Sequence, residues 1–198
     1  MVNKKDLTVP DFFTTYINAT NEKDLQEALQ ANTRRFRKLL KQIPHKKINY
    51  AYAEGKWTIK ELLQHIIDAE RVFVYRALTF TRQDPAQLPG FDENNWAITA
   101  KAPKRKWPEL IDEFKALRAS TELFFASLDD NQLLQTGTAS NKVISVAALG
   151  FVCAGHVAHH IRIIRERYLG EKATEIKVKV RKKKKNSKKK RKQGIGNK

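Results

Sequence analysis

Cysteine, glycine and proline are scarce in this chain of 198 residues. It contains one cysteine, Cys153, with 8 glycines and 6 prolines. A single cysteine cannot form an internal disulfide, so a disulfide-stapled fold is excluded and nothing requires an oxidising compartment. The low glycine and proline content excludes collagen-like and low-complexity chains. What remains is a globular protein, and its length is that of a single domain with one hydrophobic core.

Long hydrophobic runs are missing as well. No apolar stretch follows Met1, so the sequence predicts no signal peptide. The longest nearly apolar run, Val143–Gly155, is shorter than the roughly 20 residues that cross a bilayer. We therefore expect a soluble, cytoplasmic protein without a membrane span.

Several common catalytic motifs are absent. The chain contains no G-x-S-x-G, H-E-x-x-H, C-x-x-C or G-x-G-x-x-G motif and no P-loop. These absences argue against serine hydrolases, classical zinc proteases and nucleotide-binding enzymes.

Positive charge is concentrated at the carboxyl end. The net charge of +18 divides into +12 for residues 171–198 and +6 for residues 1–170. Self-repulsion and few apolar residues predict that 171–198 is a disordered tail beside one folded domain over 1–170. Such a tail binds nucleic acid weakly and without sequence preference, rests on anionic lipid or acidic protein, or only keeps the chain soluble. The sequence leaves these alternatives open.

Apolar residues recur at helical spacing in four long segments, and no segment alternates in the manner of a strand. The expected helices are 22–43, 58–81, 108–128 and 146–169. One long connection, Arg82–Trp107, joins the second to the third, and a short extra helix is expected within 9–19. This pattern predicts an all-α four-helix bundle. A connection this long inside a compact domain is usually a lid or a binding loop.

Local signals place the helix ends. Asn21 is the expected N-cap of the first helix, and Thr58 with Glu61 forms a capping box at the second. Pro108 suits the first position of the third helix, and Gly170 suits the end of the fourth.

Three of the five histidines lie on stripes that the periodicity predicts to be buried. His156 and His160 are four residues apart, so both project from one face of the fourth helix. His65 shares an apolar stripe of the second helix. Three inward nitrogens can hold one metal ion and leave coordination positions open, as catalytic sites do. The alternative is three core histidines bonded to carbonyls or carboxylates, and spacing alone leaves both open.

Two further residues are candidate catalytic groups. Asp68 follows His65 by three residues, where it would orient a ligand imidazole or act as a base. His159 adjoins His160 and would support the ligands from outside. The alternatives are a solvated carboxylate for Asp68 and a rim position for His159.

Other residues near these positions have two interpretations each. Asp92 and Glu93 in the long connection either close over the site or are simply solvated. Cys153, one turn before the histidine pair, is a thiolate ligand or, as is more common, a small buried apolar residue. Gly150 and Gly155 lower the helix propensity of the fourth helix. Their presence is explained either by close packing of another helix or by random sequence drift.

Three motifs together resemble the DinB-like superfamily. They are GKWTIKELLQHIIDAE at 55–70, LPGFDEN at 88–94 and AGHVAHH at 154–160. The resemblance covers about 9–170, with the motifs in the expected order. It implies a four-helix bundle of up-down-down-up connectivity and a divalent transition metal, zinc or nickel, held by three histidines. These map onto His65, His156 and His160.

The resemblance also indicates the class of activity. Characterised relatives include thiol-dependent transferases and isomerases, other members are described as metal-dependent hydrolases, and pairing into homodimers is frequent. We therefore expect a metal-dependent hydrolase or thiol-dependent transferase that acts on a small molecule. No recognisable motif for a low-molecular-weight thiol is present. The alternatives are a non-catalytic protein that binds nucleic acid through residues 171–198, and a bundle whose metal is only structural.

Overall fold

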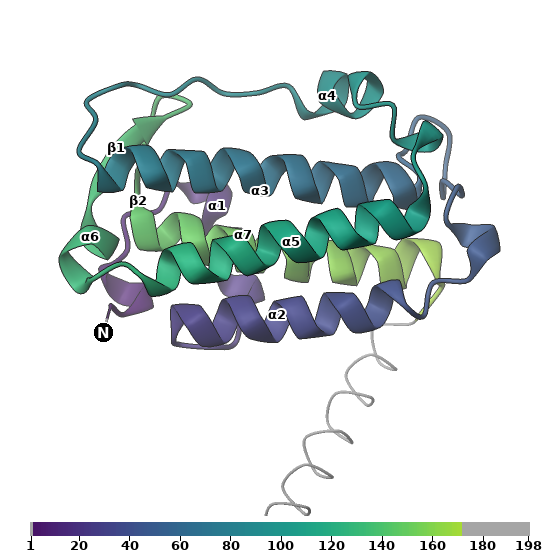
Figure 1. The fold of residues 1–198 in the computed structure, drawn as a ribbon, viewed down its shortest axis with the longest axis horizontal. Coiled ribbons are helices and arrows are strands. Elements are labelled where there is room, and N and C mark those ends of the chain that lie inside the picture. Colours follow the sequence, from purple (N-terminus) through teal and green to yellow (C-terminus); the bar gives the residue numbers. More distant parts are fainter. Residues whose placement is uncertain (1, 172–198) are drawn as a thin grey trace, which may run out of the picture.

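The computed structural model describes residues 2–171, so the predicted tail at 171–198 lies, apart from Glu171, outside the described residues. Four long helices form a bundle (Figure 1). They are α2 (Leu25–Leu40), α3 (Ile59–Thr81), α5 (Trp107–Ala126) and α7 (Val146–Ile163). The prediction of an all-α four-helix bundle is confirmed.

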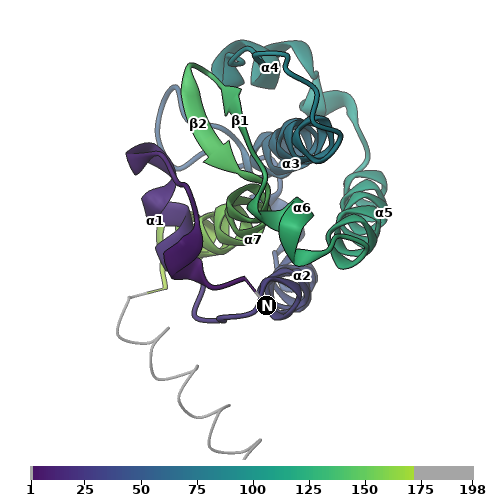
Figure 2. The ribbon, with the colours of Figure 1, turned by 90° about the vertical axis from the view of Figure 1, so that its left-hand side faces the viewer.

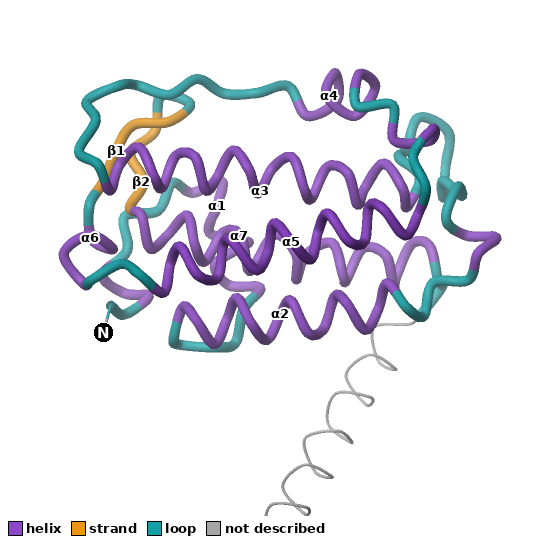
Figure 3. The backbone as a smooth tube through the Cα atoms, in the orientation of Figure 1, coloured by secondary structure: helices purple, strands orange, loops and turns teal. Residues whose placement is uncertain are grey.

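The long connection sets the topology of the bundle. After α3 the chain runs back along the length of the bundle before α5 begins, so α3 and α5 point the same way and α2 and α7 the opposite way (Figures 1 and 3). This is the expected up-down-down-up order. The connection contains α4 (Glu93–Thr99) and a short 3-10 turn, Ala102–Lys104. The returning segment thus lies against one side of the bundle, where it can cover a site.

Helix α7 is the central helix of the described chain. It packs against α2, α3 and the short helix α1 (Asp11–Ala19), which confirms the extra helix expected within 9–19. By length and composition, the segment Val146–Tyr168 is apolar enough to cross a membrane. However, 67% of its most apolar stretch is buried inside the protein. Its hydrophobicity is that of a core helix. Gly170, with φ of +67°, ends the segment after a π-helical turn over Ile164–Tyr168.

The expectation of no strands is wrong at one place. Strands β1 (Thr136–Ala139) and β2 (Lys142–Ser145) form an antiparallel hairpin after the short helix α6 (Asp130–Leu134). Its two turn residues, Ser140 and Asn141, have φ of 51° and 59°, as a type I′ turn requires. Four-residue strands are too short for alternation to stand out, so the Ser-Asn turn was the only usable signal.

One of the expected helix-end signals is confirmed here and two others are corrected. The capping box is confirmed, since the Thr58 hydroxyl accepts from the Glu61 amide at 3.2 Å and the Glu61 carboxylate accepts from the Thr58 amide at 2.7 Å. The expected cap at Asn21 is wrong. Asp24 caps α2 by accepting from the Glu27 amide at 2.7 Å, so the helix begins three residues later than expected. Pro108 is the second residue of α5 rather than the first.

Helix α1 and the hairpin lie together on one side of α7 (Figure 2). The hairpin is tied to the long connection, because the Leu88 amide donates to the Thr138 carbonyl at 3.0 Å and the Ser140 amide donates to the Leu88 carbonyl at 2.9 Å. A pocket beside α3 and α7 is lined by helix α1, the hairpin and the long connection.

Candidate metal centre and pocket

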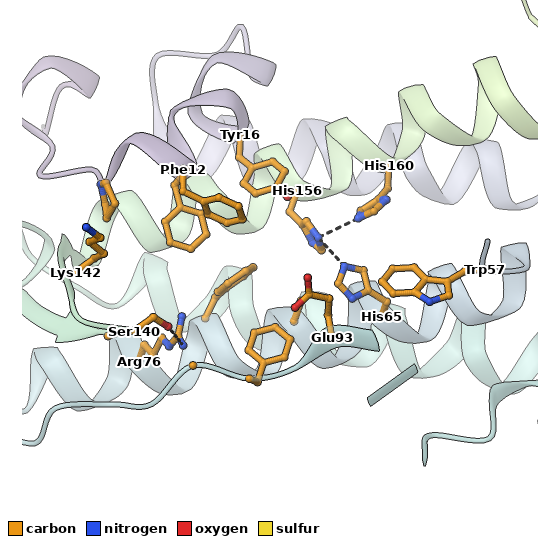
Figure 4. Close-up of a pocket in the computed structure, with 17 residues that line it drawn as sticks. Phe12, Tyr16, Trp57, His65, Arg76, Glu93, Ser140, Lys142, His156 and His160 are labelled. Atoms are coloured by element: carbon orange, nitrogen blue, oxygen red, sulfur yellow. Dashed lines mark hydrogen bonds between the residues drawn. The ribbon is translucent and has the colours of Figure 1, made fainter. Parts of the chain in front are cut away.

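Helices α3 and α7 bring His65, His156 and His160 together. The Nε2 atom of His156 lies 3.1 Å from Nε2 of His65 and 3.0 Å from Nε2 of His160. Ligand atoms of all three lie within 4.8 Å of one another. The two histidines of α7 are buried and His65 is half-buried. Figure 4 shows the three rings converging from opposite walls of a pocket.

The separations fit one metal ion better than they fit hydrogen bonds alone. A single imidazole nitrogen either donates one proton or accepts one, so His156 Nε2 cannot satisfy both neighbours by hydrogen bonding. Two nitrogens bound to one zinc ion at about 2.0–2.1 Å lie about 3.0–3.4 Å apart. The observed 3.0 and 3.1 Å are in this range. The donor set therefore suits a divalent transition metal with positions left open.

Burial keeps the three imidazoles neutral. It lowers the pKa of His65 to about 4, with the charge of Glu93 opposing the shift and His159 adding to it. Burial, followed by the neighbouring histidines, lowers the pKa of His156 and His160 well below the usual value. Neutral imidazole is the form that binds metal, so the site is prepared for a ligand role at neutral pH.

Aromatic rings hold the histidines from outside the cluster. Trp57 lies against His65 with ring centroids 4.7 Å apart, and Tyr16 of α1 meets His156 edge-on at 5.3 Å. The Nδ1 atom of His160 is buried with no hydrogen-bond partner among the described residues. The orientation of the His160 ring thus depends on packing rather than on the carboxylate–histidine pairs common behind metal ligands.

Neither of the two predicted catalytic residues, Asp68 and His159, is hydrogen-bonded to the cluster. The Asp68 carboxylate accepts from the Gln64 amide at 2.9 Å and pairs with Arg71 at 3.5 Å, and burial raises its pKa. His159 packs edge-on against Tyr16 and against His160. Neither lines the pocket. A catalytic role for Asp68 or His159 stays a prediction.

The two acidic residues of the long connection have different positions. Asp92 caps α4 by accepting from the amides of Asn94 and Asn95, both at 3.0 Å. Glu93, the first residue of α4, lines the pocket with the three histidines, and Figure 4 places its carboxylate beside His65 and His156. Of the two, Glu93 is the one positioned for chemistry.

Cys153 is a buried core residue. It is 1% exposed, and burial, followed by the charge of Glu70, raises the pKa of its thiol well above the usual value. It takes no part in the histidine cluster. A neutral thiol in the core agrees with the commoner interpretation of this cysteine.

Gly155 explains how α1 reaches the site. A Cβ atom at this position would lie 1.9 Å from the backbone carbonyl oxygen of Tyr16. Only glycine allows α1 to approach α7 this closely, and that approach places the Tyr16 ring against His156. At Gly150 the added Cβ would meet only side chains, those of Leu25 and Phe125.

The pocket has a cavity volume of about 650 Å³, within the usual range for small-molecule sites. One end holds the histidines and Glu93, and the other holds Arg76, Ser140 and Lys142 (Figure 4). Six aromatic side chains line the pocket: Phe12, Phe13, Tyr16, Trp57, Phe73 and Phe91. Trp57 lies beyond His65 at the histidine end (Figure 4).

The second end of the pocket is not predicted by the sequence patterns. Arg76 lies eleven residues after His65, which is three helical turns, and thus on the same face of α3. No acidic residue lies three or four positions away from it on the helix. A basic residue on an apolar stripe without a local acidic partner was the available signal. Ser140 and Lys142 reach the pocket only through the unpredicted hairpin.

Comparisons with known proteins agree with this fold. A family model described as the DinB superfamily matches residues 28–164. A protein of Oceanobacillus iheyensis named "Putative metal-dependent hydrolase" is 28% identical over 142 residues, covering 69% of this chain and 79% of that protein. The solved structure of YfiT from Bacillus subtilis has a TM-score of 0.64 at 15% identity, covering 83% of this chain and 91% of that one. That protein is described as "a probable metal-dependent hydrolase with an unusual four-helix bundle topology". The likeness to YfiT shows the fold.

Proposed function

The chain belongs to the DinB superfamily, and from this we propose that it is a metal-dependent hydrolase of a small organic molecule. His65, His156 and His160 would hold one divalent transition metal ion, zinc or nickel. The observation that carries the proposal is the convergence of three neutral Nε2 atoms, with separations of 3.0 and 3.1 Å around His156, at one end of a pocket. The name of the Oceanobacillus relative supports the same class of activity.

The ion would supply a Lewis acid that polarises a substrate carbonyl or phosphoryl group and lowers the pKa of water. Glu93 would take the proton from the attacking water, because its carboxylate faces the histidines and points into the pocket. The aromatic wall would exclude bulk water and so strengthen these electrostatic interactions. Asp92 contributes indirectly by fixing the first turn of α4, which carries Glu93.

Metal content tests the site directly. We expect about one zinc or nickel ion per chain in the purified, tag-free protein and none in the His156→Ala/His160→Ala double variant, measured by elemental analysis. Glu93→Gln is the matched control, since it should keep the metal. A parent protein that holds no metal after incubation with zinc or nickel and desalting would overturn the proposal.

Activity separates the catalytic candidates. Hydrolysis of ester, amide and phosphate substrates should fall about 10²–10⁴-fold in Glu93→Gln while the metal content stays unchanged. Asp68→Asn should have a smaller effect, because Asp68 is hydrogen-bonded away from the cluster. A larger loss in Asp68→Asn than in Glu93→Gln would instead assign the base to Asp68. Turnover that requires an added low-molecular-weight thiol would identify a transferase in place of a hydrolase.

A non-catalytic nucleic-acid role is the second candidate, because residues 171–198 carry a net charge of +12. It predicts salt-dependent retardation of DNA or RNA that disappears on deletion of residues 171–198 and is unchanged in the histidine variants. Homodimer formation and a cytoplasmic location also stay predictions. Light scattering of the purified chain measures the first, and cell fractionation the second.

A further inference from the structure

The guanidinium of Arg76 is buried in the pocket wall without an acidic partner. Arg76 is 3% exposed, and no carboxylate within residues 2–171 forms an ion pair with it. Its Nη2 atom donates to the Pro89 carbonyl at 2.8 Å and to the Ser140 hydroxyl at 3.1 Å, while its Nε atom is buried without a partner. A buried charge without a counter-ion is costly, so it requires an explanation.

Helix α3 places this charge on the same face as the metal centre. His65, Ala69, Phe73 and Arg76 all line the pocket, at spacings of four, four and three residues. At 1.5 Å per residue, the backbone positions of His65 and Arg76 are about 16 Å apart along the helix axis. The two polar ends of the pocket are therefore separated by a distance that an extended molecule, rather than a single small ion, would span.

The hairpin adds a second positive charge at the same end. Its type I′ turn presents the Ser140 hydroxyl to Arg76, and Lys142 follows at the start of β2. Lys142 is exposed, lines the pocket and makes no ion pair within the described part of the chain. Two cations and a hydroxyl with no carboxylate are the donor set that oxyanions prefer.

We propose that Arg76, Ser140 and Lys142 form an anion subsite, which binds a carboxylate or phosphate at one end of an elongated substrate. The apolar middle of that substrate would lie along the aromatic wall, with its scissile group at the histidines. The inference rests on the proposed hydrolase function and specifies its substrate class, an anionic amphiphile with an apolar or aromatic middle. Burial lowers the pKa of Arg76, yet arginine stays charged at neutral pH.

A purely structural role for Arg76 is the competing explanation. Its two hydrogen bonds tie α3 to the long connection and to the hairpin turn, so its removal also costs stability. Lys142 separates the two explanations. Its side chain is exposed and bonds to no described residue, so a binding defect in Lys142→Ala cannot be attributed to unfolding.

The test uses full-length, zinc-loaded protein and three probes: phenylhexanoate, its neutral analogue phenylhexanol, and phenylpentyl phosphate. Dissociation constants come from calorimetry at physiological salt, and thermal melting verifies that each variant is folded. We expect the parent to prefer an anionic probe to the alcohol by about tenfold or more. The anionic probe with the lower dissociation constant shows whether the subsite prefers a carboxylate or a phosphate. Because every variant keeps residues 171–198, any binding of the anionic probes by these basic residues is the same in the parent and in all variants.

The variants decide the assignment. Arg76→Gln should reduce the preference for the anion to near unity and Lys142→Ala should reduce it about two- to fivefold, both with zinc retained. His156→Ala should keep the preference, whereas an anion bound directly to the metal would lose it there. Three results would overturn the subsite. The parent would bind the anion and the alcohol equally, the preference for the anion would be unchanged in both Arg76→Gln and Lys142→Ala, or the preference would be lost in His156→Ala. A parent that binds neither zinc nor nickel and still prefers the anion would support the subsite and refute the metal-dependent hydrolase.

Discussion

At the scale of single residues, the core contains an ion pair that neither the histidine cluster nor the pocket uses. Arg118 and Glu70 are 0% and 2% exposed in their side chains, with Nη2 and Oε2 2.5 Å apart. Thr121 donates to the other carboxylate oxygen at 2.7 Å, and Arg118 donates to the Cys153 carbonyl at 3.2 Å. Arg118 Nε and Nη1 have no partner among the described residues. The pair is thus well buried but incompletely satisfied.

This arrangement predicts non-additive effects on stability. Arg118→Met alone should destabilise the protein by about 3–5 kcal/mol, because it leaves the Glu70 carboxylate buried without its counter-charge. The double variant Arg118→Met/Glu70→Leu should recover most of that loss, since no buried charge remains. Urea unfolding of the parent, both single variants and the double variant measures the coupling. Strictly additive effects would contradict this account.

At the scale of elements, the contact of α1 with α7 positions the wall of the metal centre. Gly155→Ala would gain about 1 kcal/mol in helix propensity. Its Cβ would, however, meet the Tyr16 backbone at 1.9 Å, a contact that no side-chain rotation relieves. We expect a net loss of about 1–3 kcal/mol and a displaced α1. Differential scanning calorimetry measures the loss of stability, and the NMR shifts of the His156 ring, against which Tyr16 of α1 packs edge-on, report the displacement.

Gly150→Ala is the matched control on the same helix. The new Cβ would meet the mobile ends of Leu25 at 2.9 Å and the Phe125 ring at 3.0 Å. Because side chains can shift by a few tenths of an ångström, the propensity gain should offset much of the cost. An equal loss of stability at both glycines would show that the Tyr16 backbone contact is not what requires glycine at position 155.

Sequence periodicity predicted the bundle because each long helix carries enough turns to show an apolar stripe. It missed the hairpin and the short helices α4 and α6, whose positions depend on contacts far along the chain, such as Leu88 with the hairpin. For the site, the i, i+4 spacing of His156 and His160 was informative because one helix supplies both. Nearness to His65 in sequence favours Asp68, which does not line the pocket. Glu93, for which the sequence leaves closure over the site and solvation open, lines it because a distant segment folds back.

At the scale of the whole molecule, ion pairs between elements make stability depend on pH. Glu113 of α5 pairs with Arg71 of α3 at 2.6 Å and with Arg105, which precedes α5, at 2.5 Å. Burial alone would raise the pKa of Glu113, but the hydrogen bonds and charges of Arg71 and Arg105 outweigh it and lower the pKa below the usual value. The folded state therefore favours the ionised carboxylate.

The sign of the pH effect follows from this shift. A carboxyl group whose pKa is lower in the folded state stabilises the fold above its unfolded pKa of about 4.3, and that contribution is lost as the pH falls through the folded value. The unfolding free energy of the parent minus that of Glu113→Gln should therefore be largest near about pH 6 and shrink towards about pH 3. Denaturant unfolding at several pH values measures the difference, and carbon-detected NMR titration of Glu113 gives its pKa independently. A constant difference across this range would show that the two arginines stabilise the neutral and ionised forms of Glu113 equally, contrary to the charge pairing that joins α3 to the start of α5.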